Sequence, residues 1–279
     1  MYQIVKKIAL SGTVTLFEIE SPLIAQTCQA GHFVILMAHE TSERIPLTIA
    51  DYDRDHGTIT LVVQEVGKSS AEICRLNEGE SPYSVLGPLG HAGRLDGVKK
   101  VVCVGGGVGI APVYPIARAY HQQGTKLISI IGARNSELLV FEDRMAEISD
   151  KLIVCTDDGT KGRKALVTQP LKEVLQTESR IDRVVAIGPT IMMKFCVETV
   201  KPFGVETIVS LNSIMVDGTG MCGGCRVSVG GETKFCCVDG PEFDGNRVDF
   251  DLLMTRQRTY HAEECRAVEE YEERTGKRE

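Results

Sequence analysis

The sequence predicts three consecutive parts: an antiparallel β barrel, a parallel α/β sheet, and a small C-terminal lobe rich in glycine and cysteine. Short apolar runs separated by turn residues fill residues 1–97, and apolar runs that alternate with helical stretches fill residues 98–210. Four cysteines and several glycines crowd residues 211–250. We expect the last segment, residues 251–279, to form a charged helix exposed to solvent.

Composition places the chain among ordinary globular proteins, because 43% of its 279 residues are hydrophobic and 25% are charged. A net charge of −7 argues against nucleic acid as a partner, since no basic stripe is present to neutralise phosphates. The sequence has no apolar run of about eighteen residues, the minimum for a bilayer span, and its start lacks an apolar signal core. We therefore expect a cytoplasmic protein without membrane segments, whose scattered single cysteines form no disulfides.

Residues 1–97 carry the pattern of a β barrel. Apolar-rich runs at Val14–Ile19, Phe33–Met37 and Thr58–Val63 are separated by Gly, Pro, Asp and Asn at strand-and-turn spacing. About six such strands favour a closed antiparallel barrel. One stretch, Ser69–Leu76, breaks the pattern and is predicted to be a short helix with a serine N-cap.

Residues 98–210 carry the pattern of a parallel sheet. The apolar runs recur every 25 to 32 residues, at Val101–Val104, Leu127–Ile131, Leu152–Cys155 and Val184–Ile187. Helical stretches lie between or after them, such as Val113–Gln123 and Met192–Val200. Continuous apolar strands that alternate with helices are typical of a parallel sheet covered on both faces.

The most distinctive stretch is the loop Asp217-Gly-Thr-Gly-Met-Cys222-Gly-Gly-Cys225, which is followed by Cys236 and Cys237. Plant-type [2Fe–2S] proteins use Cys-x₄-Cys-x₂-Cys and a distant fourth Cys. Here the later positions match that spacing, and Asp217 stands at the first. Glycines in the loop let the backbone curl and bring its N–H groups toward anionic sulfur.

Three interpretations of this loop stay open from the residues alone. The spacing favours a [2Fe–2S] cluster. A structural zinc site would also accept three cysteines and one aspartate, and buried thiols in a glycine-rich loop would need no metal. Cys236 competes with Cys237 for the last ligand position, and an aspartate before glycine, such as Asp217, is also an ordinary turn residue.

A second glycine-rich segment suits a nucleotide. The strand Val101–Val104 runs into a helix through Gly105, Gly106, Gly107 and Gly109. Glycines at such a turn let a phosphate approach the backbone, and the helix N-terminus supplies partial positive charge. A tight turn that needs glycine only for packing is the alternative.

Two segments of the predicted barrel could bind a flavin. Arg44-Ile-Pro46-Leu47-Thr48 combines a guanidinium suited to a pyrophosphate with a rigid proline and a hydroxyl that could donate to a flavin ring edge. Gly67-Lys68-Ser69-Ser70 places backbone N–H groups and hydroxyls at a predicted helix start, where anions bind. Each segment alone is also what an ordinary turn contains, but their order before the glycine-rich segment favours the binding interpretation.

Taken in order, these motifs resemble the ferredoxin–NADP⁺ reductase superfamily over nearly the whole chain. Leu86-Gly-Pro-Leu-Gly90 precedes the glycine-rich segment, Gly188-Pro189 follows the last predicted strand, and Cys237-Val-Asp-Gly-Pro241 ends the cysteine loop. Within the superfamily, the chain is similar to iron–sulfur flavoprotein subunits of dihydroorotate dehydrogenases. An aspartate at the first ligand position makes it more similar to the small subunits of electron-bifurcating, NADH-dependent reduced ferredoxin:NADP⁺ oxidoreductases.

The resemblance implies which residues bind the cofactors. Asp217, Cys222, Cys225 and Cys237 would hold a [2Fe–2S] cluster, with Cys-x-Asp-Gly-Pro selecting Cys237 over Cys236. FAD would lie between barrel and sheet, and NAD(H) would bind beside it at the glycine-rich segment and at Gly188 and Pro189. The resemblance implies no acid–base catalytic residue. It favours NAD(H), although the charges of Arg134, Lys161 and Arg163 could bind the 2′-phosphate of NADP(H).

Single electrons would leave through the cluster to a larger flavin and iron–sulfur subunit, as one half of a heterodimer. Two other functions stay open. One is the electron-transfer subunit of an NAD-dependent dihydroorotate dehydrogenase, and the other is a zinc-stabilised binding module without a redox role.

Overall fold

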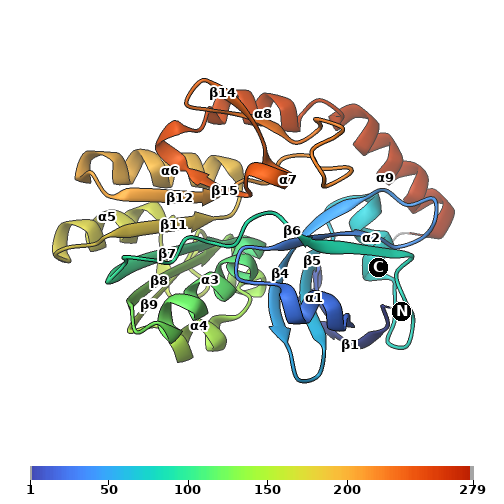
Figure 1. Cartoon of the computed structure of the whole chain (residues 1–279), viewed down its shortest axis with the longest axis horizontal. Helices are drawn as coiled ribbons and strands as arrows, with labels where there is room; N and C mark the ends of the chain where they lie inside the picture. Colours follow the sequence, from blue (N-terminus) through green and yellow to red (C-terminus); the bar gives the residue numbers. More distant parts are fainter. Residues whose placement is uncertain (1, 277–279) are drawn as a thin grey trace.

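Six antiparallel strands make up the first part of the chain in the computed structural model, which describes residues 2–276. They pair in the order β1-β2-β5-β4-β3-β6 and lie to one side of the molecule (Figure 1). Their bounds are β1 (Ile4–Ala9), β2 (Val14–Glu20), β3 (Phe33–Met37), β4 (Ile45–Asp53), β5 (Thr58–Gln64) and β6 (Ser84–Leu89). Helix α1 (Pro22–Thr27) follows β2, and α2 (Lys68–Cys74) follows β5.

The first strand is bonded to the segment that leads into the last. The backbone N–H of Ile4 donates to the Glu80 carbonyl at 2.8 Å, and the N–H of Gly79 donates to the Ile4 carbonyl at 2.8 Å. Apolar side chains from all parts of the sheet, such as Phe17 and Leu61, share one buried core. The predicted antiparallel barrel is therefore confirmed.

Helix α2 confirms the predicted short helix but corrects its cap. The N-cap is Gly67, not a serine. Ser70, at the third helical position, accepts hydrogen bonds from the backbone N–H groups of Val66 at 2.9 Å and Gly67 at 3.0 Å. The serine hydroxyl thus reaches back from inside the helix to satisfy N–H groups ahead of it.

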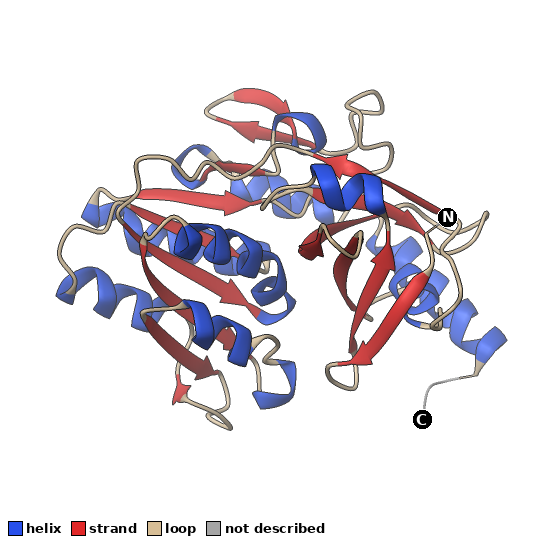
Figure 2. Cartoon of the chain, turned by 60° about the horizontal axis from the view of Figure 1, so that its bottom comes forward, coloured by secondary structure: helices blue, strands red, loops and turns tan. Residues whose placement is uncertain are grey.

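The second part of the chain is a seven-stranded sheet, which Figure 2 shows beside the barrel. Its order is β10-β9-β8-β7-β11-β12-β15, and all neighbours are parallel except β12 and β15. The strands are β7 (Lys100–Gly106), β8 (Lys126–Ala133), β9 (Lys151–Thr156), β10 (Arg163–Lys164), β11 (Arg183–Ile187), β12 (Glu206–Ser210) and β15 (Glu242–Asp244). The helices between them are α3 (Ile110–Gln122), α4 (Glu142–Ile148), α5 (Thr168–Thr177) and α6 (Thr190–Val200).

Alternate residues of each central strand enter two different cores. Val102 and Val104 of β7 pack with residues of α5 and α6, whereas Val101 and Cys103 pack with residues of α3 and α4. Helices therefore cover both faces, which explains why these strands are continuously apolar. The predicted parallel sheet is confirmed.

The third part lies across both of the others in Figure 1. It contains the hairpin β13 (Arg226–Val229) and β14 (Glu232–Phe235), then helix α7 (Cys236–Asp239). Strand β15 follows and returns to the edge of the large sheet, where it pairs antiparallel with β12. Single turns of 3₁₀ helix occur at Gly107–Gly109, Ser136–Leu138, Lys201–Phe203 and Gly245–Arg247.

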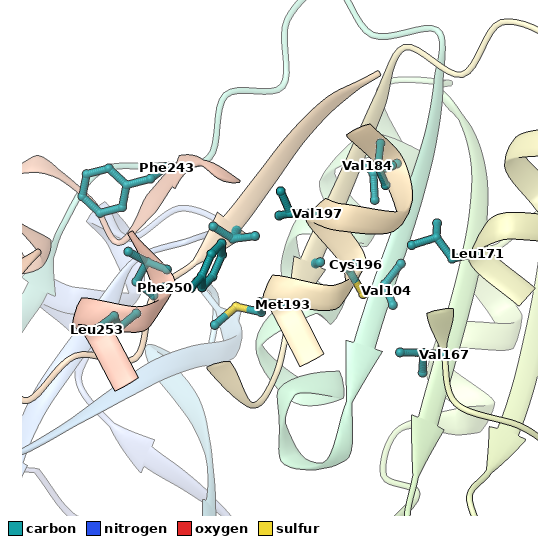
Figure 3. Close-up of a cluster of buried hydrophobic side chains, with 14 of the residues drawn as sticks. Val104, Val167, Leu171, Val184, Met193, Cys196, Val197, Phe243, Phe250 and Leu253 are labelled. Carbon is teal, nitrogen blue, oxygen red and sulfur yellow. The ribbon is translucent and has the colours of Figure 1, made fainter. Parts of the chain in front are cut away.

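The end of the described chain forms two helices, α8 (Phe250–Gln257) and α9 (His261–Thr275), and not one solvated helix as expected. Phe250 and Leu253 of α8 are buried, and Figure 3 shows them beside α6, on the side away from the sheet residues Val104 and Val184. Helix α9 is mostly exposed, but the Arg75 guanidinium lies 4.7 Å from the ring centre of the buried Tyr271. The expected fraying of the last residues lies outside the described residues.

Two further expectations concern the chain as a whole. All ten cysteines lie in the described part of the chain, and none forms a disulfide. Between residues 2 and 276, no helix combines the length and the apolar character needed to cross a bilayer.

Candidate functional site

A cavity of about 1040 Å³ lies where the barrel, the large sheet and the third part meet. Part of its wall comes from the carboxyl ends of the parallel strands, which is where ligands bind in open α/β sheets. Phe33, Pro46 and Thr48 line it from the barrel. Met215 and Pro241 line it from the third part. The volume suits ligands of cofactor size.

The glycine-rich turn after β7 forms one wall of this cavity. Gly107 has a φ of +56° and no atom within 4 Å of the place where a Cβ would stand, so its backbone is open to a ligand. A Cβ on Gly109 would lie 2.7 Å from the Cα of Gly188. Only glycine allows that approach, which brings the predicted segments Gly105–Gly109 and Gly188–Pro189 together at the start of α3.

Most of the predicted dinucleotide residues line the cavity, namely Gly106, Gly107, Gly109, Gly188 and Pro189. Gly105 lies behind them, where a Cβ would come within 2.9 Å of the Ile110 Cα. Its role in the fold is therefore the close packing of α3 on β7, as the alternative interpretation of a glycine turn expects.

The predicted flavin residues divide into two groups. Pro46 and Thr48 line the cavity, whereas Leu47 packs against the barrel core. Arg44, Gly67, Lys68, Ser69 and Ser70 lie outside the cavity wall. The hydroxyl of Ser69 donates to the carboxylate of Glu43, the residue directly before Arg44, so the second predicted flavin segment lies beside the start of the first.

Arg44 contacts the cysteine loop. Its Nε donates to the Val216 carbonyl at 2.5 Å, directly before Asp217. This contact joins the barrel to the segment that precedes the predicted cluster ligands, and neither motif signals it in the sequence.

The basic residues that could bind a 2′-phosphate are not equally available. Lys161 forms a salt bridge of 2.8 Å with Glu142, and Arg163 donates two hydrogen bonds to Glu173, at 2.6 and 2.7 Å. Arg134 lines the cavity, together with Asp157 at the end of β9. The cavity thus holds one cation suited to a phosphate and one carboxylate suited to a ribose hydroxyl.

The predicted cluster ligands lie as two pairs. The sulfur of Cys222 is 3.3 Å from Asp217 Oδ1, and the sulfurs of Cys225 and Cys237 are 3.2 Å apart. The N–H of Gly220 donates toward the Cys237 sulfur, and the charge of Asp217 acts on the same thiol, so the two pairs are close to each other. Burial, with the Cys225 thiol beside it, raises the pKa of Cys237 to about 12.

Two pairs of ligands are what the two irons of a [2Fe–2S] core would take. Within residues 2–276, no group of three or more His, Cys, Asp or Glu side chains is close enough together to hold a single ion. A [2Fe–2S] core has two irons, and in clusters with mixed ligands each iron takes a pair. Gly218, with a φ of +78°, lets the loop approach the barrel, since a Cβ there would lie 2.7 Å from Ile35 and Leu89.

Cys236 adjoins the second pair, and its backbone N–H donates to the Cys225 carbonyl at 3.1 Å, but its thiol belongs to neither pair. It is fully buried in the core shared by the sheet and the third part, and burial raises its pKa to about 12. The Asp217 carboxylate, in contrast, accepts hydrogen bonds from the N–H groups of Met221 and Cys222, each at 2.9 Å. Burial alone would raise the Asp217 pKa, but hydrogen bonds from the backbone N–H groups of Cys222 and Thr219 lower it instead.

Sequence reasoning missed several residues of the cavity wall. They include Gln64, Leu138, Phe195, Asn212, Ser213 and Met215. Gln64 ends β5 and Asn212 follows β12, so position at a strand end was an available signal for these two. Phe195 lies in the middle of α6 and carries no such signal.

A flavin-type barrel, a nucleotide-binding sheet and a cysteine loop around one cavity define an electron-transfer oxidoreductase of the ferredoxin–NADP⁺ reductase type. Residues 103–198 match the oxidoreductase NAD-binding domain, and residues 212–249 match the iron–sulfur cluster binding domain of dihydroorotate dehydrogenase B. The chain is 45% identical to a dihydroorotate dehydrogenase B (NAD⁺) electron transfer subunit homolog of Thermotoga maritima, over 99% of this chain and 98% of that one. It therefore belongs to the family of dihydroorotate dehydrogenase B electron transfer subunits and their homologues.

Solved structures agree with this assignment. A chain from the structure of an NADH-dependent reduced ferredoxin-NADP oxidoreductase, studied for flavin-based electron bifurcation, is 44% identical and superposes with a TM-score of 0.92. The match covers 97% of this chain and 98% of that one. A ferredoxin NADP⁺ reductase from Neisseria gonorrhoeae, 20% identical over 73% of this chain and 90% of that one with a TM-score of 0.60, shares the fold.

The predicted fold and the predicted cofactors FAD, NAD(H) and a [2Fe–2S] cluster are confirmed by these matches, which favour iron–sulfur over zinc. The assignments of individual binding residues remain predictions.

Proposed function

We propose that this chain accepts hydride from NADH and delivers electrons one at a time to a larger partner subunit, in a heterodimer that exchanges electrons between ferredoxin and NADP⁺. The observation that carries the proposal is the shared cavity. Gly107, Thr48 and Met215 line the same space, from the nucleotide turn, the barrel and the segment that enters the cysteine loop. The nucleotide turn, the barrel and the segment that precedes the cysteine loop therefore share one cavity.

When bound, FAD accepts the two electrons of a hydride and releases them one at a time, and a [2Fe–2S] cluster carries them onward. The role of the protein is to position these cofactors relative to one another. The open backbone at Gly107 and the N-terminus of α3 would hold the pyrophosphate of NAD(H). Pro46 and Thr48 would flank the flavin ring. Asp217, Cys222, Cys225 and Cys237 would hold the cluster, with Arg44 fixing the loop from the barrel side.

The partner would dock where the cysteine loop is exposed. Cys222 is exposed, and Met221 beside it is 89% exposed. Val216 and Val238, at 48% and 38%, add apolar surface from the same loop and from α7. Apolar side chains around an exposed cluster ligand suit a protein–protein contact for electron transfer. Ten reduced cysteines also suit a cytoplasmic location.

A second candidate is the electron-transfer subunit of a dihydroorotate dehydrogenase. The match of residues 212–249 to the cluster domain of that enzyme favours it. Both candidates share the path from NADH to the cluster and differ in the partner. Co-purification with the partner subunit from the native host, followed by assays with NADP⁺ plus ferredoxin and with dihydroorotate, separates them.

The first experiment is an anaerobic titration of the purified chain with NADH, followed by absorption spectroscopy. Flavin and iron–sulfur bands that bleach with NADH are expected. Cys222→Ser should remove the cluster signal and leave flavin reduction near the wild-type rate, whereas the matched variant Cys236→Ser should keep the cluster. A colourless protein that contains stoichiometric zinc would contradict the proposal. Reduction of NADP⁺ with ferredoxin by the isolated chain would refute the need for a partner.

A further inference from the structure

Helix α8 contacts the cavity wall through Gln257, a residue to which the proposed electron path assigns no role. The side-chain amide of Gln257 donates to the Asn212 backbone carbonyl at 2.9 Å and to Asn212 Oδ1 at 3.0 Å. The hydroxyl of the buried Thr190 lies 2.8 Å from Asn212 Oδ1 and 2.9 Å from Gln257 Oε1. A closed three-residue network thus joins α8, the start of α6 and the loop after β12.

The network determines which end of the Asn212 side chain is free. The Gln257 amide is oriented by its bond to the Asn212 backbone carbonyl, and it also donates to Asn212 Oδ1, so the opposite orientation would place the Asn212 amide nitrogen against the Gln257 donor. The single Thr190 hydroxyl proton can go to Asn212 Oδ1 or to Gln257 Oε1. Between residues 2 and 276, the amide nitrogen of Asn212 has no hydrogen-bond partner. Asn212 lines the cavity and is exposed, so a neutral N–H donor is available there to a ligand.

The position of Asn212 in the sheet indicates which part of a ligand it faces. Asn212 follows β12, whereas Arg134 and Asp157 follow β8 and β9, and strands β7 and β11 lie between the two groups. Three strand spacings separate β12 from β8, or roughly 14 Å. The charged end of the cavity suits phosphate and ribose, and the end at Asn212 is lined by uncharged residues such as Pro189 and Met215. An uncharged ring with a carbonyl group fits there.

We propose that Gln257 is a positioning residue, which holds Asn212 so that its side-chain N–H donates to a carbonyl oxygen of the bound ring system. The acceptor is the carboxamide of nicotinamide or a carbonyl of the flavin. This inference rests on the proposed function and extends the site to a helix that follows the cysteine loop.

Asn212→Asp tests the donor, because it keeps the shape and the acceptor atoms but removes the N–H. Gln257→Ala tests the positioning. Both variants should change ring binding by about two- to tenfold, the effect of one neutral hydrogen bond. A nicotinamide contact predicts weaker NADH binding with an unchanged flavin spectrum. A flavin contact predicts a shifted flavin absorption maximum and midpoint potential.

Lys194→Ala is the matched control. Lys194 forms a 2.8 Å salt bridge with Asp251, so this variant breaks another contact between α6 and α8 outside the cavity wall. It should leave NADH affinity and the flavin spectrum unchanged. The inference would be overturned if Asn212→Asp and Gln257→Ala kept the wild-type NADH affinity and flavin spectrum. It would also be overturned if Lys194→Ala changed these two properties as much as they do. A wild-type chain that binds neither FAD nor NADH would instead overturn the proposed function itself.

Discussion

Asp51 on β4 of the barrel accepts a hydrogen bond from Arg118 on α3, the helix that begins at the glycine-rich turn. The other Asp51 oxygen accepts from Arg144 of α4 at 3.2 Å. The Arg118 guanidinium also lies 5.1 Å from the ring centre of Tyr52, again on β4. One carboxylate therefore ties the two walls of the cavity together.

Replacing Asp51 by Asn should lower the free energy of unfolding by about 1–3 kcal/mol, because Arg118 would stay largely buried without its carboxylate. Asp51 and Arg118 side chains are only 20% and 21% exposed. Urea denaturation measures the loss. Arg144→Ala should cost less than about 1 kcal/mol, since the Arg144 side chain is 38% exposed. If Asp51→Asn is as stable as wild type, apolar packing alone holds the junction.

Replacing Arg44 by Ala should weaken FAD retention more than NADH binding. The guanidinium–phosphate contact predicted from the sequence would be worth about 1.5–3 kcal/mol, or roughly ten- to a hundredfold in affinity. The variant also loses the bond to the Val216 carbonyl, so the cluster EPR signal should broaden as the loop loosens. Flavin content after dialysis is the measurement. Arg54→Ala, which removes another barrel arginine bonded to a carbonyl, is the control. Full FAD occupancy without Arg44 would remove that residue from the flavin site.

Asp217→Cys should keep a cluster but change its EPR spectrum and midpoint potential, because a thiolate would replace an oxygen ligand. The variant also loses the carboxylate that accepts from the Met221 and Cys222 N–H groups. Asp217→Asn separates the two effects, since an amide oxygen can still accept those bonds. An unaltered spectrum and potential in Asp217→Cys would mean that Asp217 only shapes the turn.

Glu242 should make stability depend on pH. Its Oε1 is buried without a hydrogen-bond partner among the described residues, and burial raises its pKa from an ordinary 4.5 to about 7, against the pull of Arg183 and Arg94. Between pH 4.5 and about pH 7 the Glu242 carboxyl is deprotonated in the unfolded chain but stays protonated in the folded chain. Rising pH therefore lowers the free energy of unfolding, by about 3 kcal/mol at most.

Glu242→Gln should therefore flatten the stability profile between pH 5 and pH 8, as measured by urea denaturation at each pH. Glu198→Gln, which alters an exposed carboxylate on α6, should follow the wild-type profile. A Glu242→Gln profile parallel to wild type would show that the carboxylate is hydrated in the folded protein.

Local patterns in the sequence were enough to predict the barrel, the parallel sheet and the glycine-rich turn. Apolar-rich runs such as Val14–Ile19 and Val101–Val104 indicate buried strands by themselves, since nearly every residue of both runs is buried. Strand β15 was not predicted, because its three residues form a strand only by pairing with β12.

The same limit applies to the site. Nothing near Lys161 or Arg163 in the sequence indicates that carboxylates on α4 and α5 already neutralise them. The roles inferred for Asn212 and Gln257 depend on a contact between residues 45 positions apart. The cysteine spacing, in contrast, is a local signal, and the structure brings those side chains into two adjacent pairs.

The return of the chain at β15 has a consequence for cluster assembly. The N–H of Leu211 donates to the Pro241 carbonyl at 2.9 Å, so the whole cysteine segment is a loop whose two ends are already bonded to each other. Closing a free loop of about thirty residues costs about 3 kcal/mol in chain entropy. Pairing of β12 with β15 offsets this loss of entropy when the sheet forms. Iron and sulfide then bind a loop that is already tethered at both ends, so the fold lets cluster loading follow folding of the rest of the chain.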